Sequence, residues 1–288
     1  MSRPLVLAAL VLALALAGCG SDSRAPRAQL PAPTATTAQT AEPQPAPDPQ
    51  RAVPATAAEL AGDLTATAAS LREGILAWRR DGDPGSGDAP ADVAALAARV
   101  ERIHRALAAR RRLATRTLRR LHGLVRAEAR DVIAARRALA VLNRPRPGQD
   151  PPRIRRGPPE PADVLRRHYR EARARSGVSA TLLAAVNLIE SDFGRVRNRS
   201  VAGAQGPMQF MPATWRTYGR GGDVHDPHDA ILGAARFLAA AGARRDEAGA
   251  LYSYNPSSLY VTAVSRYARV LRRDALAFYA LYASGAGE

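Results

Sequence analysis

Apolar residues recur every three or four positions over long stretches of this chain, and this spacing restricts its fold more than any other feature. Between residues 55 and 80 the stripe consists of Leu60, Leu64, Leu71, Ile75 and Trp78. Such a period places apolar side chains on one face of an α-helix. Alanine, a strong helix former, supplies much of the apolar content. The sequence therefore predicts an all-α fold.

A second stripe runs from Val93 to Leu139, after a segment at 81–90 that is rich in glycine and proline. The two stripes predict an α-helical hairpin over residues 55–142, with two antiparallel helices. A single stripe cannot form a stable core, so the hairpin must pack on itself, on a partner or on the following domain. Recruitment of a partner through this stripe is an alternative role for the hairpin.

Residues 143–160 form a proline- and arginine-rich segment that predicts a linker to a last domain at 161–288. Apolar periods in that domain predict further helices, and Ser179 is a plausible N-cap for the second of them. The expected helices span 162–175, 179–193, 212–218, 227–241, 246–252 and 259–282.

The N-terminus predicts export. Arg3 precedes an apolar run from Leu5 to Ala17, which is too short to span a membrane as a helix and fits a signal peptide over residues 1–18. The run ends at Cys19, the chain's single cysteine, and this resembles the lipobox of bacterial lipoproteins. That resemblance implies lipidation of Cys19 and anchoring to a membrane on its extracytoplasmic face. Residues 19–54 are rich in Ala, Pro, Thr and Gln and predict a disordered tether.

The positive charge is concentrated in one region. Residues 91–159 hold 18 arginines against 5 acidic residues, within a chain whose net charge is +16. A solvated arginine-rich face explains this excess most simply, and electrostatic binding of anionic partners is the functional alternative. The export signal argues against nucleic acid as the partner.

Glu190 is the first candidate for chemistry. It lies in the last turn of the expected helix at 179–193, beside Val186 and Ile189, and Gly194 is expected to cap that helix. Apolar neighbours favour the neutral form of a carboxyl, so we expect the pKa of Glu190 to be raised, as a general acid requires. A glutamate at the boundary of an ordinary buried helix would show the same local pattern.

The segment that follows strengthens this candidate. Gly206-Pro207-Met208-Gln209-Phe210-Met211-Pro212 combines a glycine, soft apolar side chains, an amide and a proline suited to open a helix. A sugar-binding groove uses this mixture of apolar faces and polar groups.

Three blocks in this order resemble the lytic murein transglycosylase domain of lysozyme-like fold, closest to its membrane-bound B-type members. They are Glu190-Ser191, the Gly206–Pro212 run and Tyr252-Ser253-Tyr254-Asn255. The resemblance implies an enzyme acting on peptidoglycan, with Glu190 as catalytic acid and base. It implies contacts to the glycan by Ser191, Met208, Gln209, Phe210, Tyr254 and Asn255. One departure is Pro256, where the family often has a glycine soon after the Tyr-Asn pair; this proline restricts Asn255 to extended geometry.

The chain offers no persuasive second catalytic acid. Asp192 is about 200° around the helix from Glu190 and is expected to face away. The family reaction needs one acid only: it cleaves the β-1,4 bond between N-acetylmuramic acid and N-acetylglucosamine and leaves a 1,6-anhydro end. The alternatives are a lysozyme-type hydrolase on the same fold and a non-catalytic wall-binding lipoprotein. Anionic wall polymers are then candidate partners of the basic region.

The sequence predicts no cofactor and no metal site. Residues 219–229 lack the alternating oxygen ligands and the final glutamate of a calcium-binding loop, although His225 and His228 lie in this stretch. Asp226, before Pro227, is expected to cap a helix.

Overall fold

The secondary structure of the described residues is helical throughout, as the apolar periods predict. The computed structural model describes residues 48, 50–144 and 153–285. The predicted signal peptide, Cys19 and most of the tether lie outside the described residues. Within the described part of the chain there is no strand, only isolated bridges such as that between Arg156 and Val196.

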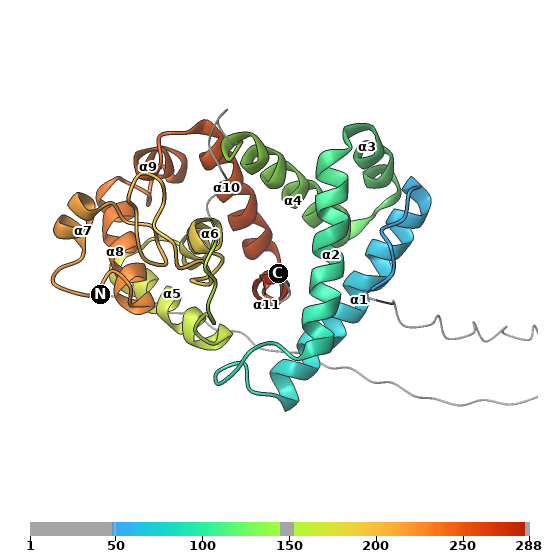
Figure 1. Ribbon diagram of the computed structural model, residues 1–288, viewed down its shortest axis with the longest axis horizontal. Helices are drawn as coiled ribbons and strands as arrows, with labels where there is room; N and C mark the ends of the chain where they lie inside the picture. The colour runs from blue at the N-terminus through green and yellow to red at the C-terminus, as the bar shows by residue number, and fades with distance from the viewer. Residues whose placement is uncertain (1–47, 49, 145–152, 286–288) are drawn as a thin grey trace, which may run out of the picture. The chain divides into compact units, whose positions relative to one another are not determined.

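The helices divide into a group before the linker and a group after it (Figure 1). Those before it are α1 (Ala57–Asp81), α2 (Ala91–Ala109), α3 (Arg111–Arg120) and α4 (Gly123–Leu142). Those after it are α5 (Ala162–Ser176), α6 (Ala180–Ser191), α7 (Pro212–Tyr218), α8 (Pro227–Ala240), α9 (Glu247–Tyr254), α10 (Ser258–Arg273) and α11 (Ala277–Ser284). No helix in the described ranges combines the length and the apolar character needed to cross a bilayer.

The expectation of two helices over 55–142 is wrong, because the second stripe is split among α2, α3 and α4. The chain leaves helical geometry at Arg110 and again at Leu121 and His122. These turns bury Leu121 and fold α4 back against α2. Arg137 of α4 then donates hydrogen bonds to the carbonyls of Leu107 and Ala108 at the end of α2. The turns are thus stabilised by tertiary contacts that a stripe does not reveal.

The last expected helix is also divided. The chain is extended at Asp274, between α10 and α11, where a continuous helix was expected over 259–282. The carboxylate of Asp274 accepts the backbone N–H of Leu276 at 3.0 Å and pairs with Arg72 of α1. A side chain that satisfies the first turn of the next helix favours this break.

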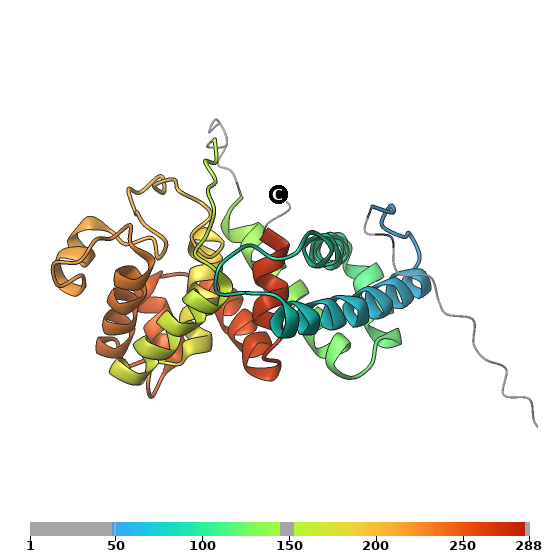
Figure 2. The same cartoon turned by 90° about the horizontal axis from the view of Figure 1, so that it is seen from below.

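The apolar stripe of α1 is buried against two different sets of helices. Its first part, including Leu60 and Leu64, packs against α2, α3 and α4 in a cluster of their own. Its second part belongs to a core shared with the helices after the linker, in which Trp78 contacts the ring of Tyr279 at 5.7 Å. Both views show α11 between the two groups of helices (Figures 1 and 2). The stripe therefore packs both on its own segment and on the following domain.

The contact between α4 and α10 is the most extensive helix pair in the described structure. At its centre the fully buried Asp131 of α4 accepts hydrogen bonds from Arg266 at 2.7 Å, Arg269 at 3.3 Å and Arg273 at 2.9 Å. Burial alone would raise the pKa of Asp131, but the hydrogen bonds from Arg266 and Arg273 hold it below its usual value.

Candidate active site

The helix α6 carries Glu190 in its last turn. Ser179 stands at its N-cap, as expected, although its side chain bonds to the hydroxyl of Thr181 and not to a backbone N–H. At the other end the expectation of a Gly194 cap is corrected. The left-handed turn begins two residues earlier, at Asp192 (φ 51°), and continues through Phe193 and Gly194. The chain thus reverses directly after Ser191.

The carboxyl of Glu190 is half-buried and has a tyrosine as its partner. The hydroxyl of Tyr260, on α10, donates a hydrogen bond to Oε1 of Glu190 at 2.6 Å. Burial raises the pKa of Glu190 to about 7, while the bond from Tyr260 acts in the opposite direction because it favours the charged form. The expected rise in the pKa through loss of hydration is confirmed. At neutral pH about half of such carboxyls carry a proton.

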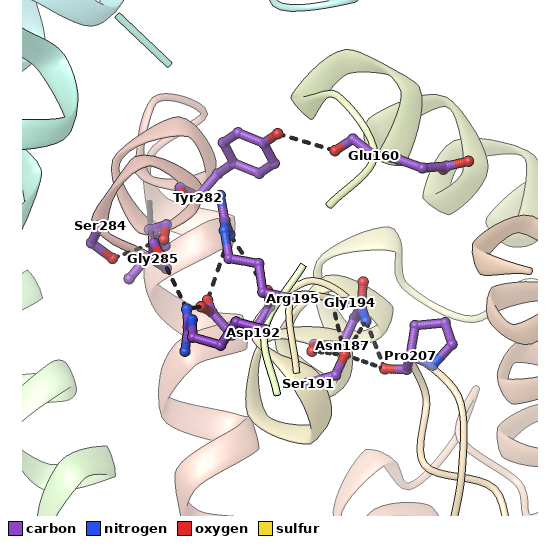
Figure 3. Close-up of polar contacts among 12 residues, drawn as sticks. Glu160, Asn187, Ser191, Asp192, Gly194, Arg195, Pro207, Tyr282, Ser284 and Gly285 are labelled. Atoms are coloured by element: carbon purple, nitrogen blue, oxygen red, sulfur yellow. Dashed lines mark hydrogen bonds and ion pairs between the residues drawn. The ribbon is translucent and has the colours of Figure 1, made fainter. Parts of the chain in front are cut away.

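The carboxylate of Asp192, directly after α6, pairs with two arginines. Its Oδ2 accepts a hydrogen bond from Nη2 of Arg156 at 2.5 Å, and Oδ1 lies 3.7 Å from Nη1 of Arg195. Arg156 also donates to the carbonyl of Gly285, after α11 (Figure 3). The carboxylate of Asp192 therefore serves an ion-pair cluster against α11. This agrees with the expectation that it faces away from Glu190.

Ser191 is buried and holds the loop before α7 in place. Its hydroxyl donates to the carbonyl oxygen of Pro207 at 2.6 Å and accepts the backbone N–H of Gly194 at 2.8 Å. Asn187, one turn earlier, donates to the same carbonyl at 2.8 Å, and both side chains point towards Pro207 in Figure 3. In this structure Ser191 positions the loop, and its expected role at the scissile sugar stays a prediction.

Two of the three residues expected to line the groove are also buried. Met208 has no exposed surface and Phe210 has 2%, because both side chains enter the core. Phe210 packs edge-on against Trp215 at 5.1 Å. Gln209 is half-buried in left-handed geometry, and its amide donates to the carbonyls of Asn198 and Gly206. Met208 and Phe210 thus anchor the loop in the core, and Gln209 is the one of the three whose side chain is partly exposed.

The structure brings Tyr254 and Asn255 to the same neighbourhood. Tyr254 is stacked on Tyr260, with ring centroids 6.4 Å apart, and its hydroxyl donates to the carbonyl of Met208 at 2.6 Å. Asn255 is half-exposed and extended (φ −141°, ψ 113°), as the proline after it predicts. Tyr254 therefore links the α9 end to both the loop and the Glu190–Tyr260 pair.

A hollow of about 590 Å³ opens beside the same turn of α6. Leu188, Ile189 and Asp192 line it together with Arg136 and Arg156. Glu190 is not part of its wall, so this hollow lies on the side of Asp192 and does not hold the Glu190 carboxyl.

Sequence reasoning missed Tyr169, Asn187 and Tyr260. Asn187 interrupts an apolar run on α6, and such a polar residue is a signal that could have been followed, since buried amides need partners. It accepts the hydroxyl of Tyr169 at 2.5 Å, which ties α5 to α6. Tyr260 carries no local signal, because its partner lies 70 residues away.

Comparison with known protein families supports the resemblance to transglycosylases that the sequence predicts for the C-terminal domain. Residues 167–274 match the family described as the Transglycosylase SLT domain. No curated protein and no solved structure matched the chain.

The C-terminal half of this all-helical protein therefore holds a lysozyme-like transglycosylase SLT domain, and α6, the Gly206–Pro212 loop, α9 and α10 lie within the matched residues. The match implies a lytic transglycosylase that acts on peptidoglycan. Glu190, Tyr254 and Tyr260 all belong to the matched segment.

Proposed function

We propose that this protein cleaves the β-1,4 bond between N-acetylmuramic acid and N-acetylglucosamine and leaves a 1,6-anhydro end, with Glu190 as acid and then as base. The observation that carries the proposal is the half-buried Glu190 carboxyl with a pKa of about 7 and a tyrosine as hydrogen-bond donor. A carboxyl with this pKa can give up and recover a proton at neutral pH.

In the first step, the protonated Glu190 donates its proton to the glycosidic oxygen as the bond to C1 breaks. The oxygen leaves with N-acetylglucosamine as a hydroxyl, and the positive centre at C1 can be supported by the neighbouring N-acetyl group. Glu190 is then a carboxylate, which the hydroxyl of Tyr260 stabilises. In the second step this carboxylate removes the proton from the C6 hydroxyl of the muramic residue, and that oxygen attacks C1.

Intramolecular attack needs no second carboxylate. A retaining or inverting hydrolase uses two acids that flank the bond. Asp192, the acid nearest in sequence, is paired with Arg156 and Arg195. A nucleophile already attached to the substrate supplies the proximity that a bound water would otherwise require.

The test is digestion of purified peptidoglycan by the full chain, followed by mass spectrometry of the products. We expect 1,6-anhydro-muropeptides from the wild type and at least a 100-fold lower rate from Glu190→Gln, about the effect of losing a general acid. Glu73→Gln, a change at an exposed glutamate of α1, is the matched control and should retain full activity. Products that end only in reducing muramic acid would show a lysozyme-type hydrolase, and retained activity in Glu190→Gln would exclude Glu190 as the acid.

We also propose that the protein is exported and anchored to a membrane through lipid on Cys19. The apolar run at residues 5–17 followed by the chain's single cysteine supports this. Metabolic labelling with a fatty acid should mark the wild type, and Cys19→Ser should abolish the label and release the protein from membranes.

The basic region supports a third proposal, that the protein binds anionic wall polymers. Arg111, Arg112, Arg116, Arg119 and Arg120 are all exposed on α3, and this helix contains no acidic residue. Binding through these side chains should weaken as salt is added, because exposed charges are screened. The amount of protein that co-sediments with cell walls should be lower for walls stripped of anionic polymers than for intact walls.

A further inference from the structure

Two histidines from separate helices, which the proposed reaction does not use, face each other on the matched domain. His168 lies on α5 and His228 in the first turn of α8, and these helices pack together (Figure 1). Their ring centroids are 4.8 Å apart, with an angle of 57° between the planes. The sequence expectation considered His228 only with His225, its neighbour along the chain.

Each imidazole has a carboxylate partner. Nε2 of His168 lies 2.9 Å from Oε2 of Glu160, and Nε2 of His228 lies 3.0 Å from Oε2 of Glu171. The other oxygen of Glu171 is held by Arg175 at 2.6 Å, which leaves Oε2 directed at His228. The cluster thus joins the end of the linker, α5 and α8.

Three of these side chains can offer ligand atoms to one ion. One atom each from His168, Glu171 and His228 lies within 4.8 Å of the other two. His168 and Glu171 are three residues apart on α5 and so share a face of the helix. Tetrahedral zinc, with bonds of about 2.0–2.2 Å, places its ligands roughly 3.4 Å apart. Small side-chain rotations would therefore close the set around an ion.

A second set of candidate ligands, which shares His228 with the first, is less suited to bind an ion. Asp226, His228 and Asp229 also lie within reach of one another. However, Asp226 caps α8 by accepting the N–H of Asp229 at 2.8 Å, and Asp229 accepts the N–H of Asp223 at 3.0 Å. These carboxylates already serve the backbone, which favours the set from α5.

We propose that His168, Glu171 and His228 bind a divalent transition-metal ion of the zinc class, which links α5 to the start of α8. Two imidazole nitrogens favour such an ion over calcium or magnesium, which prefer oxygen ligands. Glu160 acts as the outer carboxylate that orients the ring of His168. The side chains of His168, His228 and Glu171 are 17%, 35% and 36% exposed, so an ion can enter from solvent.

The experiment measures thermal unfolding of the full chain, stripped of metal with a chelator and titrated with Zn²⁺. At a hundredfold excess of Zn²⁺ over its dissociation constant, we expect the Tm to rise by about 5–10 °C. The shift should be absent in His168→Ala and in His228→Ala. His225→Ala removes an exposed histidine just before α8 and should keep the shift. Mg²⁺ and Ca²⁺ should have no comparable effect on any variant.

A spectrum with Co²⁺ in place of Zn²⁺ identifies the ligands even if one variant fails to fold. We expect visible absorption of a four-coordinate ion at one equivalent, without the near-ultraviolet band of a cobalt–thiolate bond. Such a band would assign the metal to Cys19 and overturn the proposal. A Tm and a visible spectrum unchanged by metal in the wild type would show that carboxylate–imidazole pairs alone hold the two helices. A shift that survives both histidine variants would place the metal elsewhere. None of these measurements uses peptidoglycan, so their result is independent of the proposed reaction.

Discussion

Two opposing effects set the pKa of the Glu190 carboxyl. Burial disfavours the charged form and raises the pKa to about 7, while the hydroxyl of Tyr260 favours the charged form. An acid that later becomes a base benefits from both effects, because a carboxyl without a donor would release its proton less readily in the first step.

Removal of the tyrosine hydroxyl should shift the pH profile of the reaction. With Glu190 acting first as an acid, we expect kcat/KM of the wild type to fall above about pH 7. In Tyr260→Phe the Glu190 carboxylate loses its hydrogen-bond donor, so the pKa of Glu190 rises. The falling limb of the profile then moves to higher pH by about one unit. The profile is obtained from initial rates of wall digestion between pH 4 and pH 10.

Tyr252→Phe is the control for this prediction, since that side chain is exposed on α9, the helix before the one that carries Tyr260. A limb that stays at the same pH in Tyr260→Phe would show that the hydrogen bond does not set the pKa of the catalytic acid.

At the scale of elements, the loop before α7 is held by buried polar contacts from α6. The carbonyl of Pro207 accepts hydrogen bonds from both Ser191 and Asn187. The preceding Gly206 has φ 76°, and a Cβ at this position would clash with the backbone carbonyl of Val224. The loop is thus fixed on two sides, and its geometry depends on a residue without a side chain.

Two glycines of this loop allow a matched comparison. Gly203 also has a positive φ, 91°, but no atom lies within 4 Å of the position that its Cβ would take. We expect Gly203→Ala to lower the free energy of unfolding by about 1 kcal/mol, the cost of left-handed geometry alone. Gly206→Ala should cost about 3 kcal/mol or more, because backbone must also move, and should impair wall digestion. Urea unfolding measures both; equal losses would contradict the importance of the Val224 contact.

At the scale of the whole described structure, the helices before the linker are part of the same core as the transglycosylase domain. The described residues fall in one compact unit, and the apolar cluster that contains Phe193 and Phe210 also contains Leu71, Ile75 and Trp78 of α1. The buried Asp131 on α4 adds a polar contact to α10, the helix that carries Tyr260. The N-terminal helices therefore support the position of a residue of the candidate active site.

Asp131→Asn should weaken this support. The arginines that contact Asp131 are partly exposed and can find water, so we expect a loss of about 1–3 kcal/mol and not the full cost of an isolated buried charge. Because the folded-state pKa of Asp131 is depressed, its contribution is present above the pKa of the unfolded chain and is lost as the pH falls through the folded-state pKa. The difference from wild type should therefore shrink in acid.

Urea unfolding at pH 7 and at lower pH checks this prediction, with the exposed Asp92→Asn of α2 as the control that changes stability by less than about 0.5 kcal/mol. A difference that persists unchanged in strong acid would show that the lost contact is not electrostatic.

Local patterns were sufficient for the positions of most helices and for the choice of Glu190 as the candidate acid. The periods of Leu60 to Trp78 and of α5 to α9 depend on neighbours three or four residues apart, and the expected helix at 212–218 has the observed bounds. The caps at Asp226 and the extended Asn255 are likewise local, because they follow from an adjacent proline or from the first helical turn.

By itself, then, the sequence determined the all-helical class, most of the helices and the candidate carboxyl, Glu190. Tertiary structure alone decided which residues surround that carboxyl. Tyr260 reaches Glu190, and His168 meets His228, across 70 and 60 residues of chain. It also turned Ser191, Met208 and Phe210 inward and divided the second stripe into three helices. The physical reason is the same in each case: burial and hydrogen-bond partners depend on which helices pack together, and a helical period specifies a face without specifying what will cover it.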